Sequence, residues 1–401
     1  MDCGKSYERR NMAIPLKYSL RNLFVRKVST GMTVFVVCLV VTVFLFVLAL
    51  WQGVSRTLSV TASNRNIITM RVGSQAEMQS VVTRDAYEMI RALPGIEKNP
   101  SGEPYVSPEL ISLVNLPRAD GQNSNVQVRG MAPIGFEMRP GVKILDGRMF
   151  TLGTNEALVS KNLASRFAAM KIGDTIKTGS YRWVVVGHFD ASGSAYESEV
   201  WTDAKDLQGQ TKRQIFSSVF VRASDSDAAA RFIEAVKGDQ RLKLEGKTEK
   251  KYYEEQMVTG APIKILAILV GIFTAIGASF GAMNTMYAQV AARTREIGTL
   301  RAIGFSRRSV LAAFIFEALL LCLIGGVIGT ALAFVLFNLI LTKPTGTMNF
   351  RTFSEVLFNF RLTPPLMIGG LVFSLAMGLL GGFFPAARAA RLKIINALRE
   401  I

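Results

Sequence analysis

The chain has 401 residues, of which 49% are hydrophobic and only 19% are charged, with a mean hydropathy of +0.28 and a formal net charge of +17. Soluble domains usually carry about a quarter charged residues, so the chain has too little polar surface for a soluble protein. A single His and three Cys, none paired at zinc-ligand spacing, exclude a multi-histidine metal site and a disulfide-stapled secreted domain. A membrane protein or a basic nucleic-acid-binding protein remains.

Four long apolar stretches decide between these two classes. Residues 28–52, 265–292 and 362–387 contain no charged side chain, and residues 309–342 contain only Glu317. Each stretch exceeds the roughly 20 residues that a helix needs to cross about 30 Å of hydrocarbon. The first is longer than the apolar core of a secretion signal and follows a long basic lead. We therefore expect four transmembrane helices, at residues 31–52, 262–290, 310–341 and 365–386.

Basic residues concentrate in three short segments, which predicts the orientation in the membrane. Residues 1–30, 293–308 and 388–399 hold most of the excess of Lys and Arg, whereas residues 53–261 are nearly balanced in charge. Short basic loops stay in the cytoplasm, and long domains are translocated largely regardless of charge. Both termini are therefore expected in the cytoplasm. No nucleic-acid-binding motif accompanies the positive charge, which reflects membrane topology.

The segment between the first and second spans is too long for a loop and is expected to be a domain. Its pattern mixes strands and helices and contains no Cys, so the fold class is four transmembrane α-helices plus a large α+β extracytoplasmic domain. The helix that ends this domain leads toward the second span, although Gly260 and Pro262 favour a bend. Strands are expected at 66–72, 109–116, 125–130, 156–160, 175–177, 181–189 and 219–222, and helices at 85–93 after Thr83, at 162–169, from Ser224 or Asp225 to 236, and at 248–258.

Candidate catalytic residues are sparse. His188 stands at the end of an apolar strand, where a hydrogen-bonded structural histidine is the favoured interpretation. Two segments, Gly4-Lys5-Ser6 and Gly246-Lys247-Thr248, resemble part of a phosphate-binding loop but lack its earlier glycine. We therefore expect neither enzymatic activity nor a metal or cofactor on this chain.

Glycines and one carboxylate distinguish the apolar stretches. Glu317 is costly inside a membrane. The favoured interpretation is a fixed pair with an arginine of the loop between the second and third spans or of the N-terminal helix, and the alternative is a hinge or coupling contact. The first span lacks glycine between Gly31 and Gly53, so it is the candidate lipid-facing or dimer-edge helix. The remaining spans contain GxxxG pairs that predict close helix packing, at Gly277 and Gly281, Gly325 and Gly329, and Gly378 and Gly382.

The loop between the second and third spans carries the most specific motif. It reads ARTREIGTLRAIGFSRRS over residues 292–309, a short basic segment whose Ile297, Leu300 and Ile303 recur at amphipathic spacing. From Arg293 to Gly304 it resembles the pattern R-x-R-E-I-G-x-L-R-A-x-G of the MacB/FtsX-like permeases of ABC transporters, also called type VII or mechanotransmission exporters. Further matches are Glu317 with Gly325-Gly326 and Gly329, Pro385 to Ala390, Ala397-Leu398-Arg399, and Gly147-Arg148-Met149-Phe150 with EALVSKNLA and WVVVGHF in the large domain.

The resemblance implies a permease that is coupled to an ATPase. In the family, this loop contains the coupling helix that docks on the ATPase. Members with a fused ATPase carry it ahead of the first span, where residues 1–30 stand here, so we expect a stand-alone permease subunit whose ATP and Mg are bound by a separate ATPase chain. The expected coupling residues are Arg293, Arg295, Glu296, Ile297, Gly298, Leu300, Arg301, Gly304, Arg307 and Arg308.

The resemblance also implies a function and a set of partners. The expected function is export of a substrate through conformational change in a periplasmic domain, by a dimer of identical or different permeases in the bacterial inner membrane. A periplasmic adaptor is a further candidate partner, beside membrane lipid, and no nucleic acid is expected. Two alternatives stay open: a lipoprotein- or lipid-extracting permease, whose members usually have Lys and Asp in place of Arg293 and Glu296, and a regulator of cell-wall hydrolases, whose family member has a smaller outer domain.

The expected domain order is a cytoplasmic amphipathic helix (1–30, with a plain tail as the alternative), first span (31–52), MacB-like periplasmic core domain (53–261), second span (262–290), cytoplasmic coupling loop (291–309), third span (310–341), short periplasmic loop (342–364), fourth span (365–386) and cytoplasmic tail (387–401).

Overall fold

The computed structural model describes residues 27–60, 63–179, 181–258, 261–340, 344–349, 351–358 and 362–399. The chain divides into two compact units. The helical unit comprises residues up to Leu50, Ile263–Ile340 and the chain from Arg361 onward, and the core domain comprises Trp51–Pro262 and Leu341–Phe360. Residues 1–26, which hold most of the helix expected within residues 1–30, lie outside the described residues.

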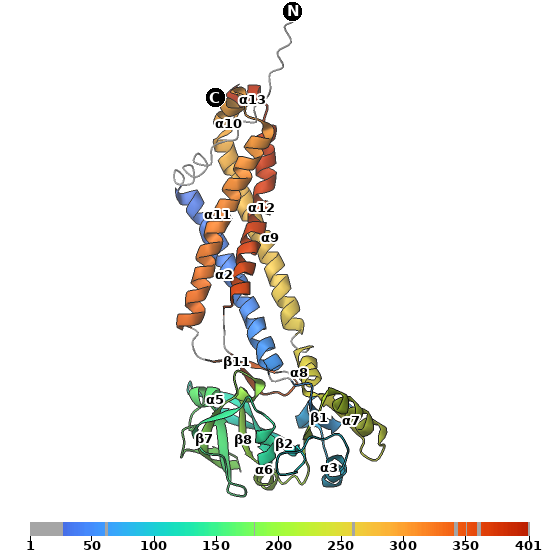
Figure 1. Ribbon diagram of the computed structural model, residues 1–401. Helices are drawn as coiled ribbons and strands as arrows, with labels where there is room; N and C mark the ends of the chain where they lie inside the picture. Colours follow the sequence, from blue (N-terminus) through green and yellow to red (C-terminus); the bar gives the residue numbers. More distant parts are fainter. Residues whose placement is uncertain are drawn as a thin grey trace, which may run out of the picture. The chain divides into compact units, whose positions relative to one another are not determined.

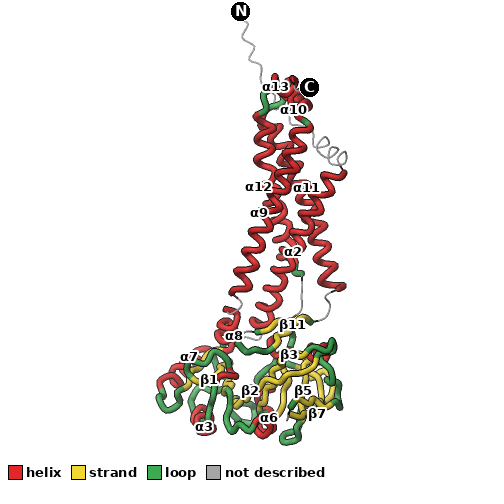
Figure 2. Tube along the Cα trace, turned by 180° about the vertical axis from the view of Figure 1, so that it is seen from behind, coloured by secondary structure: helices red, strands yellow, loops and turns green. Residues whose placement is uncertain are grey.

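Four long helices form the helical unit (Figures 1 and 2). All four are long and apolar enough to cross a membrane, which confirms the four expected spans. A π-helical turn, Leu336–Ile340, follows the third of them. Their bounds are α2 Lys27–Val60, α9 Ala261–Ala292, α11 Arg307–Val335 and α12 Pro364–Arg391.

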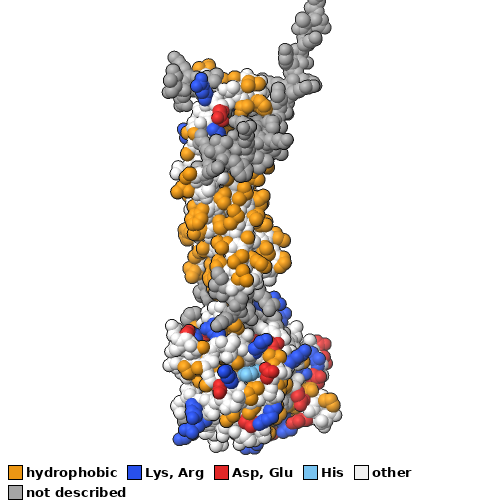
Figure 3. Space-filling view, turned by 90° about the vertical axis from the view of Figure 1, so that its left-hand side faces the viewer, with side chains coloured by type: hydrophobic (Ala, Val, Ile, Leu, Met, Phe, Trp, Pro, Cys, Tyr) orange, Lys and Arg blue, Asp and Glu red, His pale blue; other side chains and the backbone are white. Residues whose placement is uncertain are grey.

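The lateral surface of the helical unit is apolar. Figure 3 shows a continuous band of hydrophobic side chains along the helices, with charged side chains gathered elsewhere. Phe35 on α2, Phe273 on α9 and Ile368 on α12 are each more than 60% exposed. Because water disfavours so large an apolar surface, the band fits the hydrocarbon core of a bilayer.

Glycines allow α11 to pack closely against α2 and α12. A Cβ atom at Gly329 would lie 2.6 Å from the carbonyl oxygen of Cys38, and one at Gly325 would lie 2.8 Å from Cβ of Val37. On α12, a Cβ at Gly378 would approach Cβ of Cys322 to 2.9 Å, and one at Gly382 would clash with Ala318. These two GxxxG pairs therefore have the packing role expected of them.

The other two expectations about the spans concern neighbours outside this chain and stay predictions. Gly277 and Gly281 on α9 are exposed, and nothing among the described residues lies within 4 Å of a Cβ placed there. The first span, by contrast, buries Val41 and Leu45 completely. Among the described residues, α9 thus leaves a small-residue face uncovered, and α2 has both buried and exposed apolar side chains.

The core domain contains a ten-stranded mixed sheet in the order β10-β1-β9-β2-β3-β8-β5-β7-β4, with β6 paired to β7. Strands β3 and β8 are parallel, as are β5 and β7. Two hydrophobic clusters, one around Trp183 and Val128 and one around Phe232 and Ile67, define two lobes along the sheet. The bounds are β1 Asn66–Arg71, β2 Val106–Pro117, β3 Asn123–Met131, β4 Lys143–Gly147, β5 Glu156–Ser160, β6 Thr175–Thr178, β7 Tyr181–Asp190, β8 Glu199–Asp203, β9 Ser218–Arg222 and β10 Leu244–Thr248.

Side-chain caps fix where the helices of the core domain begin. Thr83 and Asp225 accept hydrogen bonds from the backbone N–H of Ala86 and Ala228, as their positions in the sequence predict. The helix that leads toward the second span is α8, which ends at Val258, and the helix of the second span, α9, begins at Ala261. The helices are α3 Arg84–Arg91, α4 Pro133–Glu137, α5 Lys161–Arg166, α6 Ala204–Thr211, α7 Ser226–Gly238 and α8 Glu249–Val258, with 3-10 turns η1 Glu77–Gln79 and η2 Ala195–Ser198.

The segment between the third and fourth spans belongs to the core domain and is more than the short loop expected at 342–364. It forms a hairpin of β11 Thr345–Met348 and β12 Glu355–Phe358. Leu357 lies in the hydrophobic cluster of one lobe, and Phe358 is fully buried. The core domain is therefore discontinuous in sequence, and the expected boundary 53–261 omits this hairpin.

Candidate functional site

The loop expected to carry the coupling residues folds as a short helix, α10 Thr294–Ala302, between α9 and α11. Gly304 follows it with φ of +117°, a backbone conformation that favours glycine. The next helix begins at once, because the Ser306 hydroxyl accepts a hydrogen bond from the backbone N–H of Ser309 at 3.1 Å. A glycine stop and a serine cap thus hold the loop in a tight turn.

One face of α10 and its preceding residue is buried in the helical unit. Arg293 Nη1 lies 3.0 Å from Glu317 Oε2, and both side chains are buried. Ile297 packs in a hydrophobic cluster with Met286 and Val290 of α9, among others. The intramembrane carboxylate therefore has the fixed arginine partner that the sequence favours, and this partner comes from the loop itself.

A second arginine ties α10 to the end of the fourth span. Arg301 Nη1 donates to the carbonyl oxygens of Ala390 at 2.8 Å and of Leu392 at 3.3 Å. Ala390 lies in the last turn of α12 and Leu392 follows its last residue, and backbone acceptors at a helix C-terminus have no intrahelical partner. The chain then continues into α13 Ile394–Arg399, which packs beside α10. Figure 1 shows α10 and α13 at the same end of the helical unit as the C-terminus.

The opposite face of the loop is exposed and charged. Arg295, Glu296, Arg307 and Arg308 are exposed, as is Ile303 at 64%. The coupling residues therefore separate into an inner set and an outer set. The inner set is Arg293, Ile297 and Gly298, which are buried, with Leu300 and Arg301 half-buried; the outer set is Arg295, Glu296, Gly304, Arg307 and Arg308.

The burial of Gly298 changes its expected role. The sequence suggests that Gly298 and Gly304 allow sharp turns or the close approach of a partner. Only Gly304 is exposed, whereas Gly298 is buried within the chain itself. A bulky residue at Gly298 would therefore disrupt the packing of α10 against the rest of the helical unit, whatever its effect on a partner.

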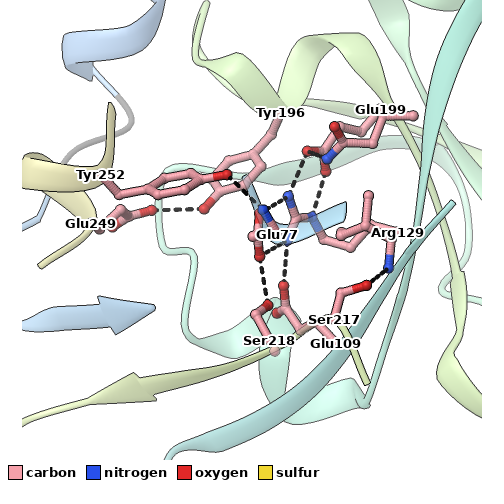
Figure 4. A network of polar contacts seen from close by, with 12 residues as sticks. Glu77, Glu109, Arg129, Tyr196, Glu199, Ser217, Ser218, Glu249 and Tyr252 are labelled. Atoms are coloured by element: carbon pink, nitrogen blue, oxygen red, sulfur yellow. Dashed lines mark hydrogen bonds and ion pairs between the residues drawn. The ribbon is translucent and has the colours of Figure 1, made fainter. Parts of the chain in front are cut away.

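The core domain contains a buried network of charges that the sequence analysis missed (Figure 4). Arg129 on β3 lies at its centre and contacts Glu199 at 2.7 Å, Glu109 at 2.5 Å and Glu77 at 3.1 Å. All four side chains are buried. Burial by itself lowers the pKa of Arg129, but the three carboxylates outweigh it and raise that pKa well above its usual value.

The network extends to α8, the last helix of the core domain before α9. Glu249, the first residue of α8, accepts hydrogen bonds from Tyr196 Oη at 2.7 Å and from Asn66 Nδ2 at 2.9 Å. Tyr252 Oη accepts a hydrogen bond from the backbone N–H of Glu77 at 3.3 Å. Burial raises the pKa of Glu249, and the hydrogen bonds from Tyr196 and Asn66 oppose that shift. The network thus joins α8 to β1 and to both 3-10 turns, η1 and η2.

Charged residues at inward-facing strand positions are the signal that would have found this network. Glu109 and Arg129 interrupt alternating apolar patterns, and Glu199 precedes the apolar pair Val200 and Trp201. Among the described residues, no group of three or more His, Cys, Asp or Glu side chains could hold a metal ion. His188 is half-buried and its Nε2–H donates to the carbonyl oxygen of Met170 at 2.7 Å, a structural arrangement.

Comparisons with known proteins agree with this architecture. The family model of the MacB-like periplasmic core domain matches residues 30–238, just over half of the chain, and that of the FtsX-like permease C-terminal region matches residues 268–394. The macrolide export ATP-binding/permease protein MacB of Sodalis glossinidius (strain morsitans) is 29% identical over 320 residues, which cover 73% of this chain and 46% of that protein. The protein of the same name from Bdellovibrio bacteriovorus is 26% identical over 423 residues, which cover 97% of this chain and 62% of that protein.

A solved structure, the periplasmic region of MacB from Actinobacillus actinomycetemcomitans, covers 48% of this chain and 93% of its own, with a TM-score of 0.37 and 14% identity. The chain spans about half the length of the curated relatives it matches. With a MacB-like core domain between its first two spans and an FtsX-like region over the last three, the chain belongs to the MacB/FtsX-like family of ABC transporter permeases.

Proposed function

We propose that the chain is a permease subunit that receives work from a separate ATPase chain at α10 and uses it to move the core domain during export of a substrate. The observation that carries this proposal is that α10 has one buried face and one exposed, charged face. Its inner face is fixed to α9, α11 and the end of α12, and its outer face presents charged side chains. A force on the outer face therefore reaches three transmembrane helices at once.

The chemistry of the outer face suits a protein partner. Three exposed arginines, Arg295, Arg307 and Arg308, belong to the outer set together with Glu296, and Ile303 is an exposed apolar side chain. Arginine forks bind carboxylates bidentately, and an apolar anchor inside a charged rim is typical of protein interfaces. The ATP and Mg of the cycle are placed on the partner ATPase in this proposal.

Export is the direction that the relatives support. Both curated relatives named above are macrolide export proteins. Release of a lipoprotein or regulation of a cell-wall hydrolase are the two rival functions, and no contact described above favours either of them. We place both termini and α10 on the cytoplasmic side of a bacterial inner membrane, because the basic segments 1–30, 293–308 and 388–399 flank the spans.

The uncovered face of α9 supports a second permease subunit. Gly277 and Gly281 are the kind of small residues through which membrane helices approach each other closely. Within this chain nothing described covers them. We assign this face to a second permease, identical or related, and include a periplasmic adaptor among the proposed partners.

The test is copurification of the ATPase with wild type and with Glu296→Lys in mild detergent. We expect the variant to insert and express normally but to lose the ATPase and its transport-coupled activity, because breaking a desolvated charge pair at an interface costs several kcal/mol. Glu234→Lys, at an exposed position on α7 of the core domain, is the matched control and should behave as wild type. Normal coupling in Glu296→Lys, or ATP hydrolysis by the purified permease alone, would contradict the proposal.

A further inference from the structure

A cavity of about 350 Å³ opens in the core domain beside the start of β1 and the start of α8. Its wall comes from five segments: residues 63–66, the turn after α4, the turn after β7 with η2, the end of β9, and the first residue of α8. Its volume lies within the range of small-molecule sites, about 300–1,000 Å³. The proposed export cycle assigns it no role.

Two arginines line the cavity from neighbouring strands. Arg222 is the last residue of β9 and lies opposite Asn66 in the antiparallel pair of β9 with β1, and Arg65 immediately precedes Asn66. Both side chains therefore come from the same end of this strand pair.

The protein holds each guanidinium group by the same two nitrogens. Arg65 donates through Nε to the carbonyl oxygen of Ala223 at 3.2 Å and through Nη2 to Glu97. Arg222 donates through Nε to Asn66 Oδ1 at 3.3 Å and through Nη2 to the carbonyl oxygen of Met138. Within the described part of the chain, Nη1 of neither arginine has a hydrogen-bond acceptor. Each guanidinium group is thus fixed in orientation and keeps its Nη1 available.

The charges around the cavity leave a positive group without compensation. Arg65 pairs with Glu97, and Arg139, which also lines the cavity, lies 2.9 Å from Glu109. Arg222 has no carboxylate within 4.0 Å among the residues described, and it rests on the ring of Tyr105 with 5.0 Å to the centroid.

The carboxyl group in the wall does not remove this excess. The carboxyl of Glu249 is occupied by Tyr196, Asn66 and the backbone N–H of Ser63, and burial raises its pKa. Its two oxygens are therefore turned to these three donors and not to the guanidinium of Arg222.

We propose that this cavity binds the phosphate or carboxylate group of a small organic anion through Arg65 and Arg222. Oriented guanidinium groups bind such groups through charge-assisted hydrogen bonds. Because Glu249 begins α8 and shares the cavity wall, an occupied cavity also stabilises the junction between α8 and the sheet. The anion is either free in solution or the headgroup of an anionic lipid.

The experiment uses the full chain. The free-anion arm titrates detergent-purified protein, in phosphate-free buffer of low ionic strength, with glycerol 3-phosphate and with succinate by isothermal titration calorimetry. The lipid arm compares thermal unfolding in phosphatidylcholine nanodiscs with and without phosphatidylglycerol. Both arms include wild type, Arg222→Gln, Arg65→Gln and the control Arg241→Gln, which removes the same charge from an exposed pair with Asp239.

Saturable binding of one free probe, weakened about tenfold or more by Arg222→Gln or Arg65→Gln but not by Arg241→Gln, supports a free anion. A stabilisation by phosphatidylglycerol that only the two cavity variants lose supports a lipid headgroup. Thermal unfolding without probe checks that each variant is folded, and Arg65→Gln carries the test if Arg222→Gln is not. No response in either arm, or equal responses in cavity and control variants, overturns the proposal without affecting the coupling role of α10.

Discussion

Arg293 and Glu317 form an ion pair at the base of α10, where both side chains are removed from water. Such a pair adds little net stability over an apolar pair of similar size, because each ion loses its hydration. Removing one partner is different, since an unpaired charge then stays buried. The pair therefore fixes the position of α10 on α11 more than it stabilises the fold.

Single and double substitutions at this pair should separate these effects. We expect Arg293→Met to lose stability, by up to about 3–5 kcal/mol, because the carboxylate of Glu317 stays buried and loses the guanidinium of Arg293. The double variant Arg293→Met with Glu317→Leu should recover most of the loss in thermal unfolding of the detergent-purified chain. A double variant that is less stable than Arg293→Met would show that the pair itself is the main stabilising contact.

The buried carboxylate Glu109 gives the core domain a predictable pH dependence. Burial by itself raises the pKa of Glu109, but Arg139 and Arg129 outweigh it and hold the pKa below the ordinary 4.5. As the pH falls, the carboxyl of Glu109 is therefore protonated at a higher pH in the unfolded chain than in the folded chain. The contribution of Glu109 to the free energy of unfolding is fully present above pH 4.5 and is lost as the pH falls through the folded-state pKa.

Glu109→Gln should therefore be less stable than wild type by about 3–5 kcal/mol at pH 7, and the difference should narrow below pH 4.5. Melting temperatures of both proteins between pH 7 and pH 3 measure this, with Glu88→Gln, an exposed position on α3, as the control. A gap that stays constant across this range would mean that the Glu109 carboxylate does not titrate differently in the folded state.

The hairpin β11–β12 is the element that most changes the expected domain organisation. Glu355 accepts a hydrogen bond from Arg118 Nη2 at 2.8 Å and one from Arg166 Nη2 at 2.8 Å, and the Leu357 backbone N–H donates to Ser198 Oγ at 2.7 Å. The chain between the third and fourth spans is thereby part of the core-domain fold.

A fragment of residues 53–261 should consequently be less stable than the same fragment with residues 344–358 joined by a flexible linker. Burial of Leu357 and Phe358 contributes about 1.5–3 kcal/mol each before the cost of ordering the hairpin. We expect the joined fragment to melt about 5–10 °C higher. Glu355→Gln in the joined fragment should lose part of that gain. Equal melting temperatures for all three fragments would place the hairpin outside the folding unit.

Local patterns explain which elements could be predicted. Strands β1, β5 and β7 alternate or end at turn residues, and the helices after Thr83 and Asp225 begin with a side-chain cap, so their positions follow from the sequence. Strand β8 carries Glu199, Thr202 and Asp203, all buried, so it has no apolar alternation to recognise. Its place between β3 and β5 depends on partners far away in the sequence.

The candidate site is likewise predictable only in part from the sequence. The motif in residues 293–304 indicates where the site lies, since it is one contiguous segment. Its division into inner and outer faces depends on Glu317 and Ala390, which only the folded chain brings to Arg293 and Arg301. The sequence therefore predicts the location of the coupling loop but could not show that Gly298 is buried.

For the whole molecule, the outer face of α10 is the proposed docking surface for the ATPase. Ile303 is 64% exposed at the end of α10, and its replacement changes none of the contacts that hold the inner face. It is therefore the position at which a docked partner can be detected with the least disturbance to the fold.

The most direct measurement places a photo-crosslinking residue at Ile303 in the complex with the ATPase, and at Phe273 on α9 and Val72 in the core domain, both also exposed, as controls. We predict an efficient crosslink to the ATPase from position 303 and none from positions 273 or 72. An ATPase that copurifies with the chain but crosslinks from a control position and not from position 303 would contradict docking at α10.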